Sequence, residues 1–121
     1  MSLETTFKRV NASAFAKVSK GVLELGIPSD TRIDIQPNAT AVIDTGVVVN
    51  IPEGHVGLME VRYKLSKHFS LVGNSTVIHH GFDESVHIHL TNLGPHLFEV
   101  PKEMGVIQIV VVPVNTAISE V

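Results

Sequence analysis

Four of the seven histidines of the chain lie close together, within the stretch TVIHHGFDESVHIHL at residues 76–90. Imidazoles at this density could bind a metal ion or act as a general base near neutral pH. His87 and His89 alternate with apolar residues, so a strand would place both side chains on one face, with Ser85 and Thr91. The opposite face of that strand, with Val86, Ile88 and Leu90, is expected to be core.

A lone His-x-His pattern supplies too few ligands for a metal site within one chain. We therefore expect His87 and His89 to lie on a polar strand face, at solvent or at a subunit interface. The alternative is a ring of histidines from several chains that binds a metal ion. His79 and His80 are expected to fill a β-turn, with the alternative that His79 contacts a sugar or a phosphate.

The elements that position these histidines are predicted to be strands, because short runs of Val, Ile and Thr are separated by Gly, Pro, Asn and Asp. One short helix is expected at 63–70. The pattern predicts an all-β sandwich or barrel-like fold in a single domain, 1–121. The predicted strands are 14–18, 21–26, 32–36, 40–43, 46–51, 55–61, 76–80, 85–91, 97–100 and 105–112.

Two of these strands carry Val or Ile at nearly every position, 47–51 and 106–112. Such runs are typical of strands that are buried on both faces. In a chain of 121 residues, this much burial indicates subunit contacts, which would also cover exposed strand edges. The pattern therefore predicts a homo-oligomer.

The composition excludes several classes of function. A net charge of −3 with no local cluster of Lys and Arg provides no surface for nucleic acid. The chain has no cysteine, which excludes disulfides and thiolate chemistry. The N-terminus shows no apolar leader, and the apolar run 106–114 is shorter than the ~20 residues of a membrane-spanning helix. These features predict a cytoplasmic protein of a cell or virus, with no membrane partner.

The order and spacing of several short motifs resemble those of the trimeric dUTPases and the related dCTP deaminases. The resemblance covers about residues 32–114 and implies a distorted β-barrel, the β-clip, that assembles as a homotrimer. It also implies active sites between subunits, where Mg²⁺ holds the triphosphate and an aspartate activates water. The motifs are Thr45-Gly46, Pro52, Gly54, Val56-Gly57-Leu58, Arg62, Leu65, His80-Gly81-Phe82, Asn92-Leu93 and Gln108.

The resemblance also implies which residues would contact a ligand. Phe82 would stack against deoxyribose, or else pack in the core. Arg62 would bind a phosphate, or else form a structural salt bridge. Gln108 is expected to satisfy backbone groups in a buried network. The full set of implied ligand contacts is Arg62, Tyr63, Lys64, His79, Phe82 and Gln108.

The chain departs from the family pattern where the chemistry is done. His79 stands at the position of the catalytic aspartate, and His89 at that of the deaminase glutamate. Tyr63 replaces the serine that follows the motif arginine, and Gly105 replaces the arginine of the fourth motif. The acid of the first motif is expected near Gly26, with Asp30 or Asp34 as stand-ins. Residues 115–121 contain no glycine, so the closing arm is expected to be absent.

Each such group typically contributes ~2.7–4 kcal/mol to transition-state stabilisation. The losses therefore predict a family member without catalysis that serves as a binding, regulatory or structural module, such as one from a phage. Its partners would be itself, a deoxynucleotide or a protein, with no cofactor. The alternative is a Mg²⁺-dependent dUTP or dNTP pyrophosphatase with His79 as base. A second alternative is a metal-dependent assembly held by His87 and His89.

Overall fold

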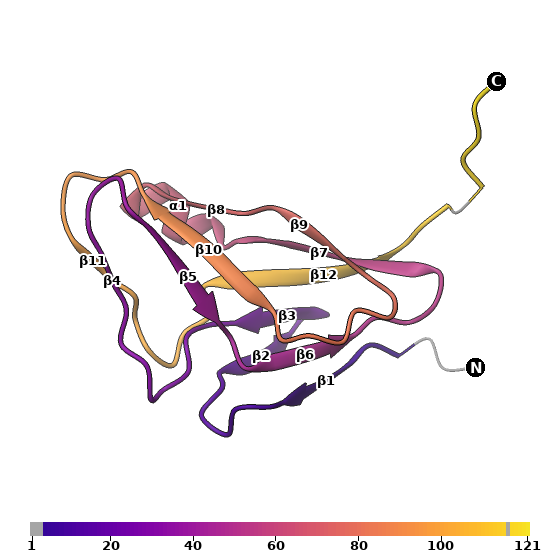
Figure 1. Ribbon diagram of the computed structural model, residues 1–121, viewed down its shortest axis with the longest axis horizontal. Helices are drawn as coiled ribbons and strands as arrows, with labels where there is room; N and C mark the ends of the chain where they lie inside the picture. Colours follow the sequence, from indigo (N-terminus) through magenta and orange to yellow (C-terminus); the bar gives the residue numbers. More distant parts are fainter. Residues whose placement is uncertain (1–3, 116) are drawn as a thin grey trace.

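The computed structural model describes residues 4–115 and 117–121 of the chain. These residues form strands and one short helix, α1 (Tyr63–Phe69), as Figure 1 shows. The strands are β1 (Thr6–Arg9), β2 (Ala16–Ser19), β3 (Val22–Leu25), β4 (Asp34–Ile35), β5 (Thr40–Asp44), β6 (Val47–Asn50), β7 (His55–Val61), β8 (Leu71–Gly73), β9 (Thr76–His79), β10 (His87–Asn92), β11 (Phe98–Glu99) and β12 (Ile107–Pro113).

The strands of the described residues form four separate sheets. The largest has the order β2-β3-β12-β7-β9, and a three-stranded sheet has the order β5-β10-β8. The pairs β1-β6 and β11-β4 form the other two sheets. The predicted all-β fold with one short helix is therefore confirmed, but the described strands do not close into a single barrel.

The core lies between the five-stranded sheet and the smaller sheets. In β12, Ile107 and Ile109 are buried, and Ile109 is paired with Leu23 of β3 and with Met59 of β7. Paired residues of antiparallel strands share a face, so these apolar side chains form one layer of the core. Val86, just before β10, and Ile88 and Leu90 within it are buried, which confirms the predicted core face.

Each of the ten predicted strands corresponds to a strand of the structure, and α1 ends one residue before the predicted bound. Two strands were not predicted, β1 and β8. β1 has the sequence TFKR with no fully buried residue, and β8 has three residues ending in Gly73. Both form because a partner strand, β6 or β10, supplies the hydrogen bonds, which a local apolar pattern does not reveal.

In the single chain, the two Val- and Ile-rich strands are fully buried on one face only. In β6, Val47 and Val49 are buried, whereas Val48 is only half-buried. In β12, Val110 and Val112 are half-buried, because they point away from the core layer. The second face of each strand is therefore a surface of this chain. No helix in the described part of the chain is long and apolar enough to cross a membrane.

Asn92 fastens the end of β10 to the neighbouring loops. Its side chain is buried, and its Nδ2 donates hydrogen bonds to the carbonyls of Ile35 (2.9 Å) and His96 (2.7 Å). Its Oδ1 accepts a hydrogen bond from the Gly94 N–H at 2.9 Å. A buried amide with every polar atom paired is costly to replace, because its partners would remain unpaired.

We expect Asn92→Asp to lower the free energy of unfolding by about 3 kcal/mol, because a carboxylate cannot donate to two buried carbonyls. Urea unfolding measures this. Asn50→Asp is the matched control, because Asn50 is exposed and its side-chain amide lies 3.5 Å from the Thr6 hydroxyl. A midpoint for Asn92→Asp equal to that of the wild type would contradict the role of this amide.

Candidate functional site

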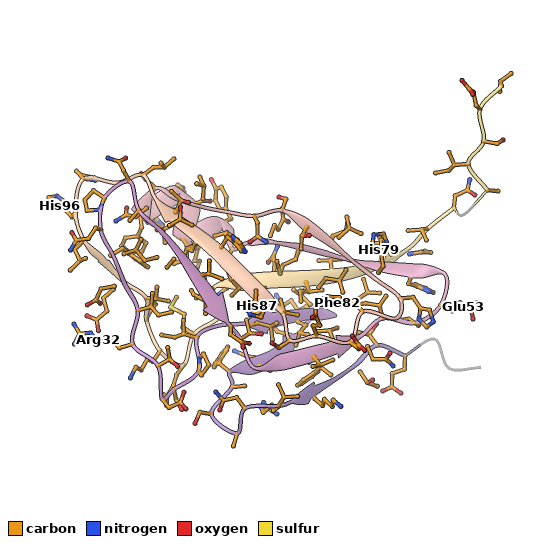
Figure 2. The ribbon with its side chains drawn as sticks, viewed as in Figure 1. Arg32, Glu53, His79, Phe82, His87 and His96 are labelled. Carbon is orange, nitrogen blue, oxygen red and sulfur yellow. The ribbon has the colours of Figure 1, made fainter. Side chains whose placement is uncertain are left out.

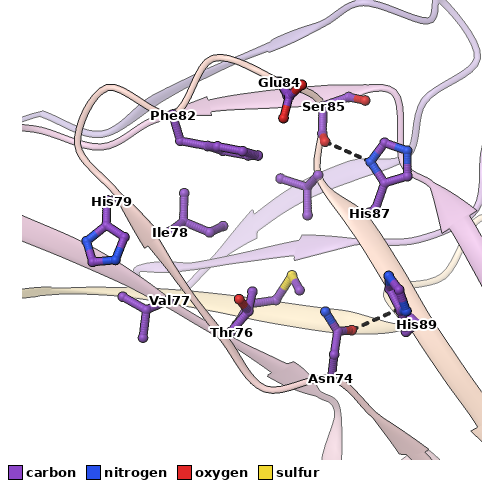
Figure 3. A pocket seen from close by; sticks show the side chains of 12 residues that line it. Asn74, Thr76, Val77, Ile78, His79, Phe82, Glu84, Ser85, His87 and His89 are labelled. Atoms are coloured by element: carbon purple, nitrogen blue, oxygen red, sulfur yellow. Dashed lines mark hydrogen bonds between the residues drawn. The ribbon is translucent and has the colours of Figure 1, made fainter.

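A cavity with a volume of about 520 Å³ lies between β9 and β10. That is enough for a nucleoside-sized ligand. Figure 2 places His79, Phe82 and His87 in the same region of the molecule, and Figure 3 shows the cavity itself. It is lined by Met59, Asn74, Thr76, Val77, Ile78, His79, Phe82, Glu84, Ser85, Val86, His87 and His89.

The cavity combines an aromatic ring with a polar rim. Phe82 is 39% exposed and lines the cavity, so it is not a core residue. His79 lies across the cavity from His87 and His89 (Figure 3). Glu84 is the one carboxylate among the lining residues, and no Lys or Arg is among them. The site is therefore suited to a neutral, flat ligand with hydrogen-bonding groups more than to a polyanion.

A tight turn after β9 sets the position of Phe82. The Phe82 N–H donates to the His79 carbonyl at 3.2 Å, and Gly81 has a φ of 91°, a left-handed conformation that favours glycine. His80 Nδ1 lies 2.7 Å from the Ile51 carbonyl, which ties the turn to the end of β6. The predicted β-turn at His79 and His80 is therefore confirmed.

The far end of this loop is held by the turn between β5 and β6. Buried Thr45 donates from its hydroxyl (2.7 Å) and from its N–H (3.0 Å) to the Val86 carbonyl. The Val86 N–H donates to the Val47 carbonyl at 2.8 Å. Asp44 accepts hydrogen bonds from the Gly46 N–H (2.9 Å) and the Ser85 hydroxyl (2.8 Å). The loop that lines the cavity is thus fixed at both ends.

His87 and His89 lie on the exposed face of β10, as predicted. His87 Nδ1 lies 3.0 Å from the Ser85 carbonyl, and His87 Nε2 lies 3.8 Å from Asp44 Oδ2. The backbone N–H of His89 donates to Asn74 Oδ1 at 2.9 Å. Among the described residues, no three His, Asp or Glu side chains gather closely enough to hold a metal ion.

Arg62 lies outside the cavity and is engaged within the chain. Its Nε donates to Glu24 Oε1 at 2.9 Å, and its Nη1 donates to the Gly105 carbonyl at 3.4 Å. Of the two roles considered for Arg62, the single chain shows the salt bridge. Tyr63 is 71% exposed, and Lys64 is exposed beside it in the first turn of α1. None of these three residues lines the cavity.

The acid beside Arg62 is Glu24, which the sequence analysis did not identify. Gly26, the predicted position, is buried, and a Cβ there would overlap the Met104 carbonyl oxygen. Asp30 contacts Thr31, and Asp34 of β4 pairs with Arg32 in the single chain. The alternation of residues in β3 could have identified Glu24. It lies between the buried Leu23 and Leu25, so its side chain must point away from the core.

The expected role of Gln108 is also different in the structure. Gln108 lies on the outer face of the five-stranded sheet, is half-buried, and donates from Nε2 to Glu60 Oε1 at 3.4 Å. It was expected to satisfy backbone groups in a buried network. The direction of its side chain follows from its neighbours, because Ile107 and Ile109 point into the core.

The residues around the cavity do not fit Mg²⁺. This ion prefers oxygen ligands in octahedral geometry, commonly one or two carboxylates with waters. The cavity offers imidazoles and the single carboxylate Glu84. The carboxylates of Glu24 and Glu60 are engaged with Arg62 and Gln108.

The family model for dUTPase matches residues 12–121 of the chain. The chain belongs to this family. It is 32% identical over 95 residues to the deoxyuridine 5'-triphosphate nucleotidohydrolase of Sinorhizobium medicae, covering 77% of this chain and 59% of that protein. It is 35% identical over 92 residues to the protein of the same name from Cutibacterium acnes, covering 73% and 60%. The chain thus spans about three fifths of the length of these relatives.

The solved structures that it resembles include phage dUTPases. A variant of the dUTPase from phage phi11 of S. aureus has a TM-score of 0.85 at 19% identity, covering 97% of this chain and 95% of that one. The Staphylococcus bacteriophage 80alpha dUTPase has a TM-score of 0.85 at 21% identity, covering 98% and 96%. At these identities the likeness establishes the shared fold.

Asp44 makes the stability of the loop dependent on pH. Hydrogen bonds from the Gly46 N–H and then from the Ser85 hydroxyl, with a smaller effect of His87, lower the pKa of the Asp44 carboxyl. A carboxyl with a lowered pKa stabilises the folded state above its ordinary pKa, near ~3.9. This stabilisation is lost as the pH falls through the lowered value.

We expect Asp44→Asn to reduce the free energy of unfolding at pH 7 by about 1 kcal/mol. The difference from wild type should begin to shrink below a pH of about 4, where the carboxyl of the unfolded chain becomes protonated, and should vanish once the pH has fallen through the lowered pKa of the folded carboxyl. Urea unfolding across this pH range measures both effects. Asp83→Asn, an exposed change in the same loop, is the control. A difference that stays constant down to acid pH would refute the assignment.

Proposed function

We propose that this chain is a self-associating member of the dUTPase family that binds a ligand without hydrolysing dUTP. The observation that carries this proposal is the chemistry of the 520 Å³ cavity, which has three imidazoles, one carboxylate and no Lys or Arg among its lining residues. His79 stands at the turn where the family resemblance places the catalytic aspartate. A neutral imidazole cannot supply the fixed negative charge that orients an attacking water.

The charges around the cavity also disfavour a nucleoside triphosphate. Asp83 and Glu84 are exposed in the loop that borders it, and like charges disfavour the approach of phosphates. Arg62, which could pair with phosphate, is bonded to Glu24 in the chain. Phe82, Asn74 and Ser85 remain suited to a base or a sugar, through ring contact and hydrogen bonds. A nucleoside or deoxynucleotide is the ligand class that we infer.

The alternative function is hydrolysis of dUTP with His79 as general base. The names of the relatives favour it, since several are called deoxyuridine 5'-triphosphate nucleotidohydrolase. His79 is exposed at the border of the cavity, where an imidazole could accept a proton from water.

A steady-state assay of dUTP and the other dNTPs with Mg²⁺ separates the two functions. We expect no turnover above the rate of His79→Ala, because the groups that position water and phosphate are replaced. Enzymes of ordinary efficiency turn over at roughly 1–10³ per second. Turnover in that range that disappears in His79→Ala would establish the alternative.

Self-association is supported by the outer face of the five-stranded sheet. Leu58 of β7 is paired with Val77 of β9 and with Val110 of β12, so the three side chains share a face. Leu58 is 43% and Val77 is 45% exposed in the single chain. Contiguous apolar surface of this kind marks an interface. We call these three residues the apolar patch and propose that it lies in the homotrimer that the family resemblance implies.

We expect light scattering to give a mass near three times the 13.1 kDa of one chain, and Leu58→Lys to shift it toward the monomer. A charge in an apolar interface has no compensating partner there. Val42→Lys is the matched control, since Val42 is 56% exposed on the three-stranded sheet.

A chelator should leave the mass of the wild type unchanged, whereas dissociation in the chelator would favour the assembly held by His87 and His89. A monomeric wild type would refute the proposal.

A protein that binds a ligand without hydrolysing it could serve a regulatory role. The 80alpha phage dUTPases, which share the fold, are described as controlling transfer of virulence genes. A dUTPase scaffold can thus act on processes other than nucleotide hydrolysis. For this chain, such a role would use ligand occupancy of the cavity as the signal and a protein as the partner.

A further inference from the structure

Glu84 gives the 520 Å³ cavity between β9 and β10 a negative charge that no neighbouring group neutralises. It is the single carboxylate among the residues that line the cavity, and no Lys or Arg is among them. Within the described part of the chain, the Glu84 carboxylate forms no hydrogen bond and no ion pair. A ligand that enters the cavity therefore meets this charge directly.

The imidazoles around the cavity do not cancel the charge of Glu84 at neutral pH. His79, His87 and His89 line the cavity, and the imidazole of a histidine is mostly uncharged at about pH 7.5. His87 also lies beside Asp44, with 3.8 Å between His87 Nε2 and Asp44 Oδ2. A positive charge on His87 would thus be compensated by Asp44. The lining of the cavity is negative in sum.

The nearby charges of Lys8 and Asp83 belong to a different cavity. That cavity has a volume of about 300 Å³ and also borders Phe82. Lys8 and Asp83 are among its lining residues, and neither lines the 520 Å³ cavity. Lys8 therefore supplies no cation next to Glu84. Asp83 is a second carboxylate, one residue away along the chain, that a ligand beside Glu84 does not contact.

Phe82 adds a second group that favours a positive charge. Figure 3 shows Phe82 and Glu84 on the same side of the cavity, across from Asn74 and Thr76. The face of an aromatic ring is negative and attracts cations, and it also stacks with flat rings. The aromatic face and the carboxylate together favour a ligand that is both planar and cationic.

We propose that the cavity selects a nucleoside whose base carries a positive charge. This inference rests on the proposed function, because it names the ligand of the same cavity. A cationic base, such as a cytosine methylated on its ring nitrogen, stacks on Phe82 and donates from its exocyclic amine to Glu84. Both partners of that hydrogen bond are charged, which makes it a strong one.

Asn74 provides the matching donor on the other side of the cavity. Its Oδ1 accepts a hydrogen bond from the His89 N–H at 2.9 Å, so its Nδ2 remains to donate to the ligand. A cytosine ring has a carbonyl that accepts such a bond. An uncharged base makes this contact and the stack on Phe82, but it lacks the charge that Glu84 attracts.

The test compares N3-methyldeoxycytidine, a cation at neutral pH, with uncharged deoxycytidine, by calorimetry on the full chain. We expect the cation to bind about tenfold more tightly, because charge-assisted hydrogen bonding and the aromatic face both favour it. Glu84→Gln keeps the size of the side chain and should reduce this preference to about twofold or less. Phe82→Leu should also reduce the preference, because it keeps an apolar side chain and removes the ring face.

Asp83→Asn is the matched control for Glu84→Gln. It removes the same formal charge one residue away, from the lining of the other cavity, and should retain the preference for the cation. Tetramethylammonium tests the need for a planar ring. We expect it to show no binding at concentrations at which the methylated nucleoside saturates the chain.

Three results would overturn the proposal. They are equal binding of the two nucleosides by the wild type, a preference that survives in Glu84→Gln, and a preference that Asp83→Asn abolishes as fully as Glu84→Gln. Tetramethylammonium binding as tightly as the methylated nucleoside would also overturn it. Equal binding of the nucleosides would leave the proposed function standing. Turnover of dUTP by a wild type that prefers the cation would refute the proposed function alone.

Discussion

The contact between Thr45 and Val86 is the constraint on which the candidate site depends. Thr45 is fully buried, and both its hydroxyl and its N–H donate to the Val86 carbonyl. The next residue, Gly46, has a φ of 68°, and a Cβ there would lie 2.6 Å from Asn11 Cβ. Only a glycine permits this turn between β5 and β6. The turn in its place holds the end of the loop that lines the cavity. Ser85 and His87 take their positions from it.

This constraint separates the scaffold of the site from its chemistry. The bonds that shape the loop are made by Thr45, by Asp44 and by backbone groups, and none of them uses the side chain of His79 or His89. The residues at the border of the cavity can therefore change while the cavity keeps its shape. A chain can retain the dUTPase fold with imidazoles at positions where the family resemblance places acids.

The sequence predicted what local periodicity controls and missed what depends on contacts between distant residues. The alternation of β10 placed Ile88 and Leu90 in the core and His87 and His89 outside. The strand β8 was missed, since its formation depends on pairing with β10. Gln108 was misplaced, because an apolar run does not reveal which face is covered. The aromatic Phe82 was located in the right loop, and the cavity beside it required the fold.

The trio of Glu24, Arg62 and Gly105 shows why a site can be misread from residues taken one at a time. In the sequence, Arg62 is a retained family residue, and Gly105 is the loss of an arginine. In the fold, the two are a single arrangement, because the absent side chain at 105 leaves room for Glu24 on the guanidinium. An arginine at 105 would conflict with Glu24 by contact. Where the family resemblance places a second arginine, the fold thus has a glycine packed beside the ion pair of Glu24 and Arg62.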